Sequence, residues 1–493
     1  MFLAVDMGTT NAKACIFDEY GSPIVMVRSE YPTKSQRVSP YETFEVALRI
    51  LKEVVQKGRI PASDIRGLVF SARNDQGATV ALDEEDRPLE LRVSIQEVQE
   101  ISRQLESELF PQHIQELLGV LGIVPLLKWM QTESRDQYQR ITKLMGVKEY
   151  ALYRLSGAFS CDTLDRGYLR VPVSFCEKKG IIEDAEAKLP EVVPPTKIVG
   201  ELKPEYARRL GLRESLPVCV GSRDGNCGNI GCGTVELGQA CTTLATYGVI
   251  RVVWDRPVLD LPKNRISPRL HAVPGQWLID STPGGGAIAL RWFRDNFAQL
   301  EQLTATNTGT DVYGILDKEA ELVNQLPEGL LFLPYMTGMS APERERNARA
   351  VIFGLGLNHT RGDIMRAIMA GIVYAIRSGM EIIEDAGAEV TELRATGGGA
   401  RAPLWNQMQA DIMNRPVLKS SVEEVECLGA SILLATGLGI SSSVKEAVAK
   451  MVHIKEIFYP REEYRVFHNR QYQTYLKLCS YFTERGIWRA LLA

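Results

Sequence analysis

The opening segment, residues 1–21, constrains the fold of this chain more than any other stretch. Two short apolar runs, residues 2–5 and 14–17, flank the polar sequence Asp-Met-Gly-Thr-Thr-Asn-Ala-Lys. Apolar runs separated by a short polar segment that contains glycine are typical of two strands joined by a tight loop. We therefore expect the chain to begin with a β-hairpin.

The tip of this hairpin carries an unusual set of side chains. Thr9, Thr10 and Lys13 supply hydrogen-bond donors, and Asp6 supplies a carboxylate beside them. Gly8 permits close approach of a ligand to the backbone. Donors clustered beside one acid suit a phosphate chain with a bound cation. An ordinary hairpin with a polar turn explains the same residues equally well.

The size and charge of the chain exclude several classes of protein. A chain of 493 residues exceeds what one hydrophobic core usually serves, so at least two domains are expected. The net charge of −4 leaves no basic excess for a nucleic-acid backbone. The longest weakly polar run, Cys427–Ile440, is too short to cross a membrane. No nucleic-acid or membrane partner is therefore expected.

The start of the chain and its cysteines indicate a cytoplasmic protein. The N-terminus lacks a basic segment, and Asp6 interrupts the first apolar run, so no signal peptide is expected. The nine cysteines lack paired spacing and complete no zinc site. Buried free thiols in a reducing compartment are the expected state.

Two strand ends carry further polar side chains. A predicted strand over residues 65–70 leads into Arg73-Asn74-Asp75-Gln76, where either a small polar ligand or a plain charged loop fits the pattern. A second strand, over 216–220, opens into a Gly-rich segment that contains Asp224 and begins a helix. Doubly wound α/β proteins place active groups at such turns. The same position also suits an ordinary helix N-cap, which is the commoner use of an aspartate there.

Other segments have clear periodicity. Residues 242–253 are strongly β-forming, with a Thr-Tyr-Gly kink at 246–248, and 161–165 reads as a turn with two acids. Helices are predicted over 43–57, 136–145, 360–386, 403–413 and 461–482. A strand over 393–396 ends in three glycines, and Gly397-x-Gly399-x-x-Ala402 fits a relaxed dinucleotide fingerprint. Because no acid follows on the next strand to hold a ribose hydroxyl, a nicotinamide-dependent dehydrogenase is the least favoured alternative.

Three Gly/Thr-rich strand turns therefore recur: Asp6–Lys13, Ala245–Gly248 and Gly397–Ala400, with Asp224 where the two halves meet. In this order they resemble the FGGY carbohydrate kinases, a family of the actin-like and hexokinase-like superfamily. The resemblance spans nearly the whole chain. Its further matching segments are Phe17-Asp18, Glu149-Tyr150 through Ser156-Gly157, Gly221–Gly231, Asn347–Leu355, Arg366-Ala367 and Thr396–Val417.

The resemblance implies an α/β protein of two ribonuclease-H-like domains with a central cleft. The N-terminal domain, residues 1–236, would bind the sugar and carry the phosphate hairpin and the catalytic base. The C-terminal domain, residues 237–493, would bind ATP. The implied reaction transfers the γ-phosphoryl group of ATP to a hydroxyl of a sugar, polyol or sugar acid. Family members are often dimers, so a homodimer is an open expectation.

The resemblance also implies roles for individual residues. Asp224 would be the general base, and Asp6 would hold Mg²⁺. The β- and γ-phosphates would meet Thr9, Thr10 and Lys13, while Thr246 would contact the γ-phosphate. The adenosine would pack against the backbone at Gly398, Gly399 and Ala400.

The substrate side departs from the family pattern. Asp75 is an acid where a neutral or basic group is usual, and a usual Trp-x-Asp-x-Arg set falls on Ile95, Glu97 and Gln99. Tyr247 likewise stands in the second phosphate turn in place of a usual serine. We therefore take Arg73, Asn74, Asp75 and Gln76 as the candidate sugar contacts. The alternative function is a catalytically weak or inactive homologue that binds a sugar or a nucleotide.

Overall fold

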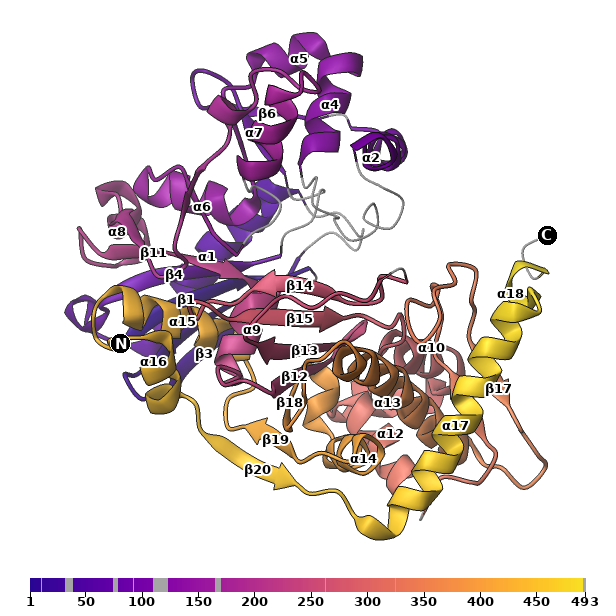
Figure 1. Ribbon diagram of the computed structural model, residues 1–493. Coiled ribbons are helices and arrows are strands. Elements are labelled where there is room, and N and C mark those ends of the chain that lie inside the picture. Colours follow the sequence, from indigo (N-terminus) through magenta and orange to yellow (C-terminus); the bar gives the residue numbers. More distant parts are fainter. Residues whose placement is uncertain are drawn as a thin grey trace. The chain divides into compact units, whose positions relative to one another are not determined.

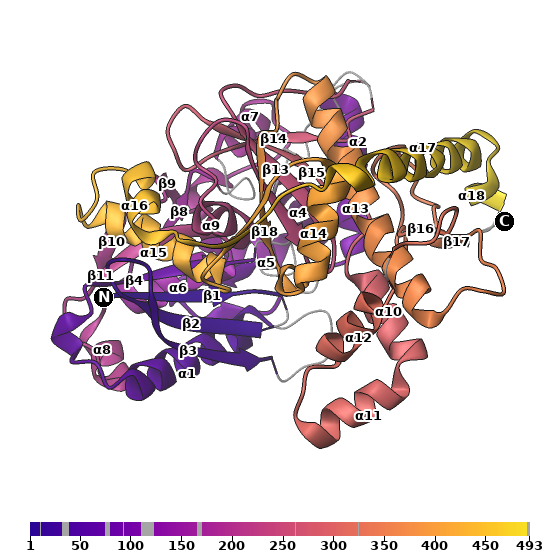
Figure 2. The same cartoon turned by 90° about the horizontal axis from the view of Figure 1, so that it is seen from below.

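The computed structural model describes residues 1–9, 11–31, 39–73, 79–91, 93–109, 123–164, 170–261, 263–323 and 325–490 (Figures 1 and 2). The chain forms two compact units. Unit 1 comprises residues 1–233, 270–274 and 424–452, and unit 2 comprises residues 234–269, 275–423 and 453–493. The domain boundary after residue 236 stays a prediction of the sequence.

Unit 1 is built on a six-stranded sheet with the order β10-β11-β4-β1-β2-β3 (Figure 2). Strand β1 pairs antiparallel with β2 and parallel with β4, and β4 pairs parallel with β11. The bounds are β1 Phe2–Met7, β2 Asn11–Phe17, β3 Pro23–Glu30, β4 Gly67–Ala72, β10 Ile198–Glu201 and β11 Pro217–Arg223. The predicted N-terminal hairpin is therefore confirmed.

The hairpin register decides which side chains share a face of this sheet. Asp6 lies opposite Lys13 on β2 and opposite Ser71 on β4. Because side chains alternate along a strand, these three point to one face, whereas their apolar neighbours on β1, Val5 and Met7, point to the other. The chain thus concentrates its polar residues on a single side of the sheet.

Helices cover both faces of the sheet. Helices α1 (Pro40–Gly58) and α6 (Val147–Ser156) pack on one face, together with α8 (Pro204–Leu210) against α1. Helix α15 (Val425–Gly437) crosses the other face over β1, β4 and β11. Helices α9 (Asp224–Gly231) and α16 (Val444–Met451) pack against α15. The polar face of the sheet therefore lies under α15.

Helices α9 and α15 touch through their backbones. A Cβ atom on Gly231 would lie 1.8 Å from the carbonyl oxygen of Val425, and one on Gly429 would lie 1.8 Å from that of Cys227. No side chain fits at such separations, so both positions require glycine. This crossing fixes the start of α15 beside α9.

A second core within unit 1 gathers around a three-stranded sheet, β6-β5-β7. Its strands are β5 Val80–Leu82, β6 Pro88–Leu89 and β7 Lys143–Met145, and its helices are α2 Ile95–Leu109, α4 Val124–Glu133, α5 Arg135–Arg140 and α7 Arg170–Lys178. The helix predicted over 136–145 is wrong in its second half, because residues 143–145 pair with β5 instead. Tertiary pairing there overrides the local periodicity.

The turn predicted over 161–165 is also wrong at its start. Cys161 and Asp162 belong to strand β8 (Ser160–Asp162), which pairs parallel with β9 (Glu191–Val193). Asp162 is fully buried, whereas Asp165 lies outside the described residues. A buried acid in a short strand carries no periodic signal, which explains the error.

Unit 2 is built on a seven-stranded sheet with the order β14-β15-β13-β12-β18-β19-β20 (Figure 1). Strand β12 pairs antiparallel with β13 and parallel with β18, so the β-forming stretch predicted at 242–253 is a hairpin. The bounds are β12 Gln239–Leu244, β13 Gly248–Trp254, β14 Ser267–Leu270, β15 Trp277–Ser281, β18 Glu392–Thr396, β19 Val417–Ser420 and β20 Ile454–Phe458.

A long helix, α13 (Arg361–Asp385), packs on this sheet against β13 and β15. It begins with a capping box in which Thr360 and Asp363 each bond the other's backbone N–H. Around it lie α10 Ile288–Phe297, α11 Gln299–Thr308, α12 Val312–Glu321, α14 Pro403–Met413, α17 Glu462–Glu484 and α18 Ile487–Ala490, with the hairpin β16 Leu331–Leu333 and β17 Val351–Phe353. Among the described helices, none is long and apolar enough to span a bilayer.

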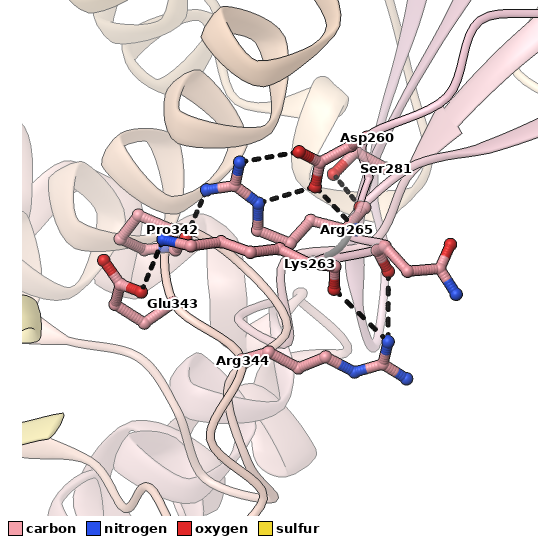
Figure 3. A network of polar contacts seen from close by, with 8 residues as sticks. Asp260, Lys263, Arg265, Ser281, Pro342, Glu343 and Arg344 are labelled. Carbon is pink, nitrogen blue, oxygen red and sulfur yellow. Dashed lines mark hydrogen bonds and ion pairs between the residues drawn. The ribbon is translucent and has the colours of Figure 1, made fainter. Parts of the chain in front are cut away.

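Two loops of unit 2 are joined by ion pairs (Figure 3). Arg265 forms two hydrogen bonds with the Asp260 carboxylate, at 2.7 and 2.8 Å, and a third with the carbonyl oxygen of Pro342, at 2.8 Å. Lys263 pairs with Glu343 at 3.2 Å. The Arg265 hydrogen bonds lower the pKa of Asp260. These contacts fix the loop before β14 to the segment around residue 342.

The buried histidine His468 predicts how the stability of unit 2 changes with pH. Its ring lies in the core beside α13, where Tyr374 shares a hydrogen bond of 3.0 Å with Nδ1, and burial lowers its pKa to about 4. The unfolded chain binds this proton near pH 6.5, so the free energy of unfolding falls as pH drops from about 6.5 to 4, by up to about 3 kcal/mol.

Urea unfolding at several pH values measures this loss. His468→Gln should flatten the pH dependence within that window, since glutamine keeps a polar partner for Tyr374 but binds no proton. An unchanged pH dependence in the variant would contradict the assignment.

Candidate active site

Asp6 is the buried acid at the centre of the unit 1 site. Its carboxylate is 3% exposed and accepts a hydrogen bond of 2.8 Å from the Ser71 hydroxyl. Burial is the main cause that raises the pKa of Asp6 to about 8; Lys13 opposes the rise, and the nearby carboxylates of Glu426 and Asp224 add to it. The site therefore gathers several carboxyl groups around one lysine in a place with little water.

Lys13 lies between two acids that the sequence interpretation missed. Its ammonium is 2.5 Å from Glu424 and 3.5 Å from Glu426. Burial alone would lower the pKa of Lys13, but the carboxylates of Glu426, Asp6 and Glu424 outweigh it, so the net shift is upward. Burial raises the pKa of Glu426. Both acids come from the start of α15, far from the hairpin in sequence, and no local motif linked them to Lys13.

Asp224 is the first residue of α9, directly after β11, as predicted. Its carboxylate accepts the N–H of Gly225 at 2.7 Å, so it does bond to the start of the helix. The side chain is only partly buried. Strand β11, which ends directly before Asp224, pairs at Ser222 with Ser71 of β4, whose hydroxyl bonds the Asp6 carboxylate. The structure thus brings Asp6, Lys13 and Asp224 together in unit 1.

A buried polar network lies behind the turn that carries Asp224. The Lys148 ammonium is 2.7 Å from Glu149 and 3.0 Å from Asp162. Asp162 in turn accepts a hydrogen bond of 2.9 Å from Ser222, which also accepts one of 3.2 Å from Asn226. Because Ser222 and Asn226 stand on either side of Asp224 in the chain, this network holds the turn from β11 into α9.

The remaining predicted contacts in unit 1 are only partly described. Thr9 is exposed at the hairpin tip, whereas Thr10 lies outside the described residues. Arg73 is buried directly after β4, and its backbone N–H donates to the Met7 carbonyl at 3.0 Å. Asn74, Asp75 and Gln76 also lie outside the described residues. Tyr31 is a further residue of this site that the sequence did not indicate. Burial raises its pKa, the Asp6 carboxylate raises it further, and the Arg73 guanidinium lowers it.

Glu97 has an aromatic partner from another part of the chain. The Trp129 indole N–H, on α4, donates to the Glu97 carboxylate on α2 at 2.6 Å. The sequence interpretation noted that a usual tryptophan is missing at Ile95. Trp129 comes from a different helix, so no motif around residue 95 indicates it.

In unit 2 the predicted phosphate turn lies between β12 and β13. Thr246 and Tyr247 are exposed there. The carbonyl of Ala245 accepts the N–H of Ala287 at 2.8 Å, and that of Thr246 accepts the N–H of Ile288 at 3.2 Å. The segment that begins α10 therefore braces this turn and leaves the Thr246 side chain exposed.

The glycine run after β18 forms a short 3-10 turn, Gly398–Arg401. Gly397 has φ +84°, and a Cβ there would lie 2.7 Å from the Leu244 carbonyl oxygen, so glycine is required. Gly398 faces open space, whereas a Cβ on Gly399 would lie 2.4 Å from the Trp405 ring. Ala400 is buried. Gly399 thus serves packing against Trp405, whatever else it contacts.

These features define the class of the protein. A phosphate-type hairpin with an acid and a lysine, an aspartate at a strand–helix turn, and a second Gly/Thr turn beside a glycine run together indicate an ATP-dependent sugar kinase with the two-domain fold of actin and hexokinase. Two family models agree: the N-terminal domain of the FGGY family of carbohydrate kinases matches residues 1–231, and its C-terminal domain matches residues 258–438. The chain belongs to the FGGY family of carbohydrate kinases.

Individual relatives are similar along almost the whole chain. A gluconokinase of Bacillus subtilis (strain 168) is 30% identical over 472 residues, covering 91% of this chain and 90% of the relative. A xylulose kinase of Staphylococcus epidermidis (strain ATCC 12228 / FDA PCI 1200) is 26% identical, covering 96% and 95%. A crystal structure of a gluconate kinase from Lactobacillus acidophilus superposes with a TM-score of 0.81 at 22% identity, covering 98% of both chains. The predicted fold and the predicted carbohydrate kinase activity are confirmed.

The buried lysine behind Asp224 gives a test of how the site is supported. Lys148→Met should lower the free energy of unfolding by about 3–5 kcal/mol, because it leaves the buried carboxylates of Glu149 and Asp162 without their countercharge. Chemical unfolding of the purified chain measures this change.

The matched control is Lys57→Met. Lys57 pairs with Glu53 on the exposed side of α1, so its loss should cost at most about 1 kcal/mol. Equal effects of the two substitutions would show that the buried network adds no special stability.

Proposed function

We propose that Asp224 is the general base of this kinase. It would accept the proton of the acceptor hydroxyl as the new P–O bond forms and the bond to the ADP leaving group breaks. The observation that carries this proposal is the strand register in unit 1, which pairs Asp6 with Lys13 and Ser71 and brings the end of β11, directly before Asp224, beside Ser71. A carboxylate suits the role because proton removal occurs late in such transfers.

Lys13, Thr9 and Thr10 form the proposed binding set for the β- and γ-phosphates. Lys13 supplies positive charge and the two threonines supply hydroxyl and backbone donors, so charge that builds up on the phosphoryl oxygens is offset as it forms. In unit 2, Thr246 is proposed to contact the γ-phosphate, and the backbone of Gly398, Gly399 and Ala400 the adenosine. The exposure of Thr246 and the open space beside Gly398 support these roles.

Asp6 is proposed to hold Mg²⁺. Within the described ranges, no three His, Cys, Asp or Glu side chains are spaced to bind a metal by themselves. Mg²⁺ commonly binds through one or two carboxylates together with substrate phosphates, so a single buried carboxylate fits it. When bound, it would neutralise charge on the phosphates. Ser71 would orient the Asp6 carboxylate through its hydrogen bond.

We propose a sugar acid as the acceptor, with a ketose as the second candidate. Relatives named gluconokinase are 30% and 29% identical to this chain, and relatives named xylulose kinase reach 26% and 27%. Arg73 supplies a buried cation at the end of β4 that a carboxylate of the acceptor would pair with. Asn74, Asp75 and Gln76 are proposed to bind its hydroxyls.

We further propose a cytoplasmic location, a homodimer and no nucleic-acid partner. All nine cysteines are buried and none forms a disulfide, which supports a reducing compartment. The net charge of −4 is unfavourable for binding a phosphate backbone. The homodimer is proposed because members of the family are often dimers.

The base assignment predicts a specific kinetic defect. Asp224→Asn should lower kcat by about 10² to 10⁴, the usual contribution of general-base catalysis, and should change the affinity for ATP by less than about threefold. ADP release with D-gluconate or D-xylulose measures kcat. The exposed Asp64→Asn serves as a control that keeps full activity. Full activity in Asp224→Asn would refute the assignment.

The acceptor assignment predicts a split between substrates. Arg73→Gln should lower kcat/KM for D-gluconate by about 10- to 100-fold, because a charge-assisted hydrogen bond is lost, and that for D-xylulose by less than about threefold. Parallel assays on the two acceptors measure the ratio. Equal losses on both would show that Arg73 does not recognise the carboxylate.

A further inference from the structure

The contact between Lys13 and the start of α15 has no role in the mechanism above. Glu424 is the residue directly before α15 and is 6% exposed, and Glu426 lies in the first turn of the helix. The Lys13 ammonium lies 2.5 Å from the Glu424 carboxylate, in a pair that is largely shielded from water, and 3.5 Å from the carboxylate of Glu426, which is more exposed. An exposed pair contributes little, but removing one partner from a shielded pair is costly.

The backbone fixes the place of both acids. Gly231 of α9 lies against the carbonyl of Val425, the residue between Glu424 and Glu426, at a separation that admits no Cβ. Gly429, one turn further along α15, lies equally close to the carbonyl of Cys227. The start of α15 cannot shift without breaking this crossing. The two carboxylates therefore act on Lys13 from a rigid support.

A lysine that is already immobilised binds phosphate more tightly than a mobile one, because less entropy is lost on binding. A lysine side chain loses up to about 2 kcal/mol of rotamer entropy when it is immobilised. In this chain that loss has occurred before any ligand arrives, since Glu424 already orders the ammonium. An ammonium also has three N–H donors, so two carboxylates that accept one each leave a donor for a phosphate oxygen.

We propose that Glu424 and, more weakly, Glu426 are positioning residues that hold the Lys13 ammonium for the phosphates of the nucleotide. This inference rests on the proposed function, because it takes Lys13 as a phosphate ligand. Glu424 has the larger share, since its carboxylate is closer and more deeply buried than that of Glu426. Neither acid touches the reacting atoms in this account.

The alternative hypothesis is that the two carboxylates weaken nucleotide binding. Carboxylates paired with the Lys13 ammonium would then compete with the phosphates for it, and removing a carboxylate would tighten nucleotide binding. The sign of the change in affinity separates the two, so the experiment measures binding rather than turnover.

The test is a double-mutant cycle read by calorimetry with Mg²⁺ and a non-hydrolysable ATP analogue, without acceptor. Glu424→Gln should raise Kd at least tenfold, and Lys13→Met should raise it at least as much. The double variant should bind within about twofold of Lys13→Met, because Glu424 acts only through Lys13. Glu426→Gln, which leaves Lys13 unchanged, should raise Kd by about two- to threefold.

Two controls distinguish a change in the position of Lys13 from a loss of folding. Glu19→Gln removes a carboxylate from a more exposed lysine pair of the same unit and should leave Kd unchanged. Thermal unfolding checks that each variant is folded. Should Lys13→Met alone fail to fold, Glu424→Gln and Glu426→Gln still decide the sign of the effect.

The outcomes distinguish this inference from the proposed function. Tighter or equal binding by Glu424→Gln would overturn the inference, and so would a tenfold loss that persists in the Lys13→Met background. A native chain that binds the analogue and transfers no phosphoryl group to any acceptor would contradict the proposed function alone. A native chain that binds no analogue would overturn both.

Discussion

The close crossing of α9 and α15 is the constraint on which the site in unit 1 depends. Gly231 and Gly429 bring the two backbones into contact. As a result, the start of α15, where Glu424 pairs with Lys13 on the polar face of the sheet, lies beside α9, the helix that begins at Asp224. Segments that are distant in sequence thereby enclose one buried group of charges, which a larger residue at either glycine would separate.

Burial makes the charges of this group depend on one another. The carboxylate of Asp6 is nearly inaccessible, and Lys13 keeps its charge because acids surround it. Behind them, Lys148 and Asp162 form a second buried pair under the turn to Asp224. Isolated charges of this kind would be costly in a protein interior, so each needs its partner. A site rich in fixed charge suits phosphoryl transfer, where positioning and charge neutralisation supply most of the catalysis.

Local patterns in the sequence predicted what local physics determines. The hairpin, the strand–helix turn at Asp224 and the long helix α13 follow from apolar periodicity and turn residues, and all three are confirmed. The strand β7 was mistaken for helix, because its pairing with β5 is set by tertiary contact. Glu424 and Trp129 were missed as partners for the same reason: each meets a residue from a remote segment. The order of the motifs along the chain indicated the family. Residues that contact the site from remote segments, such as Glu424, could be identified only in the structure.

A crystal structure of the chain with Mg²⁺, a non-hydrolysable ATP analogue and D-gluconate would test the central claim most directly. The account predicts that an acceptor hydroxyl lies within hydrogen-bonding distance of the Asp224 carboxylate, and that the Lys13 ammonium contacts the β- or γ-phosphate. An acceptor bound away from Asp224, with that carboxylate bonded only to the N–H groups of α9, would contradict it. In that case Asp224 would be a helix cap, and the base would have to be sought elsewhere.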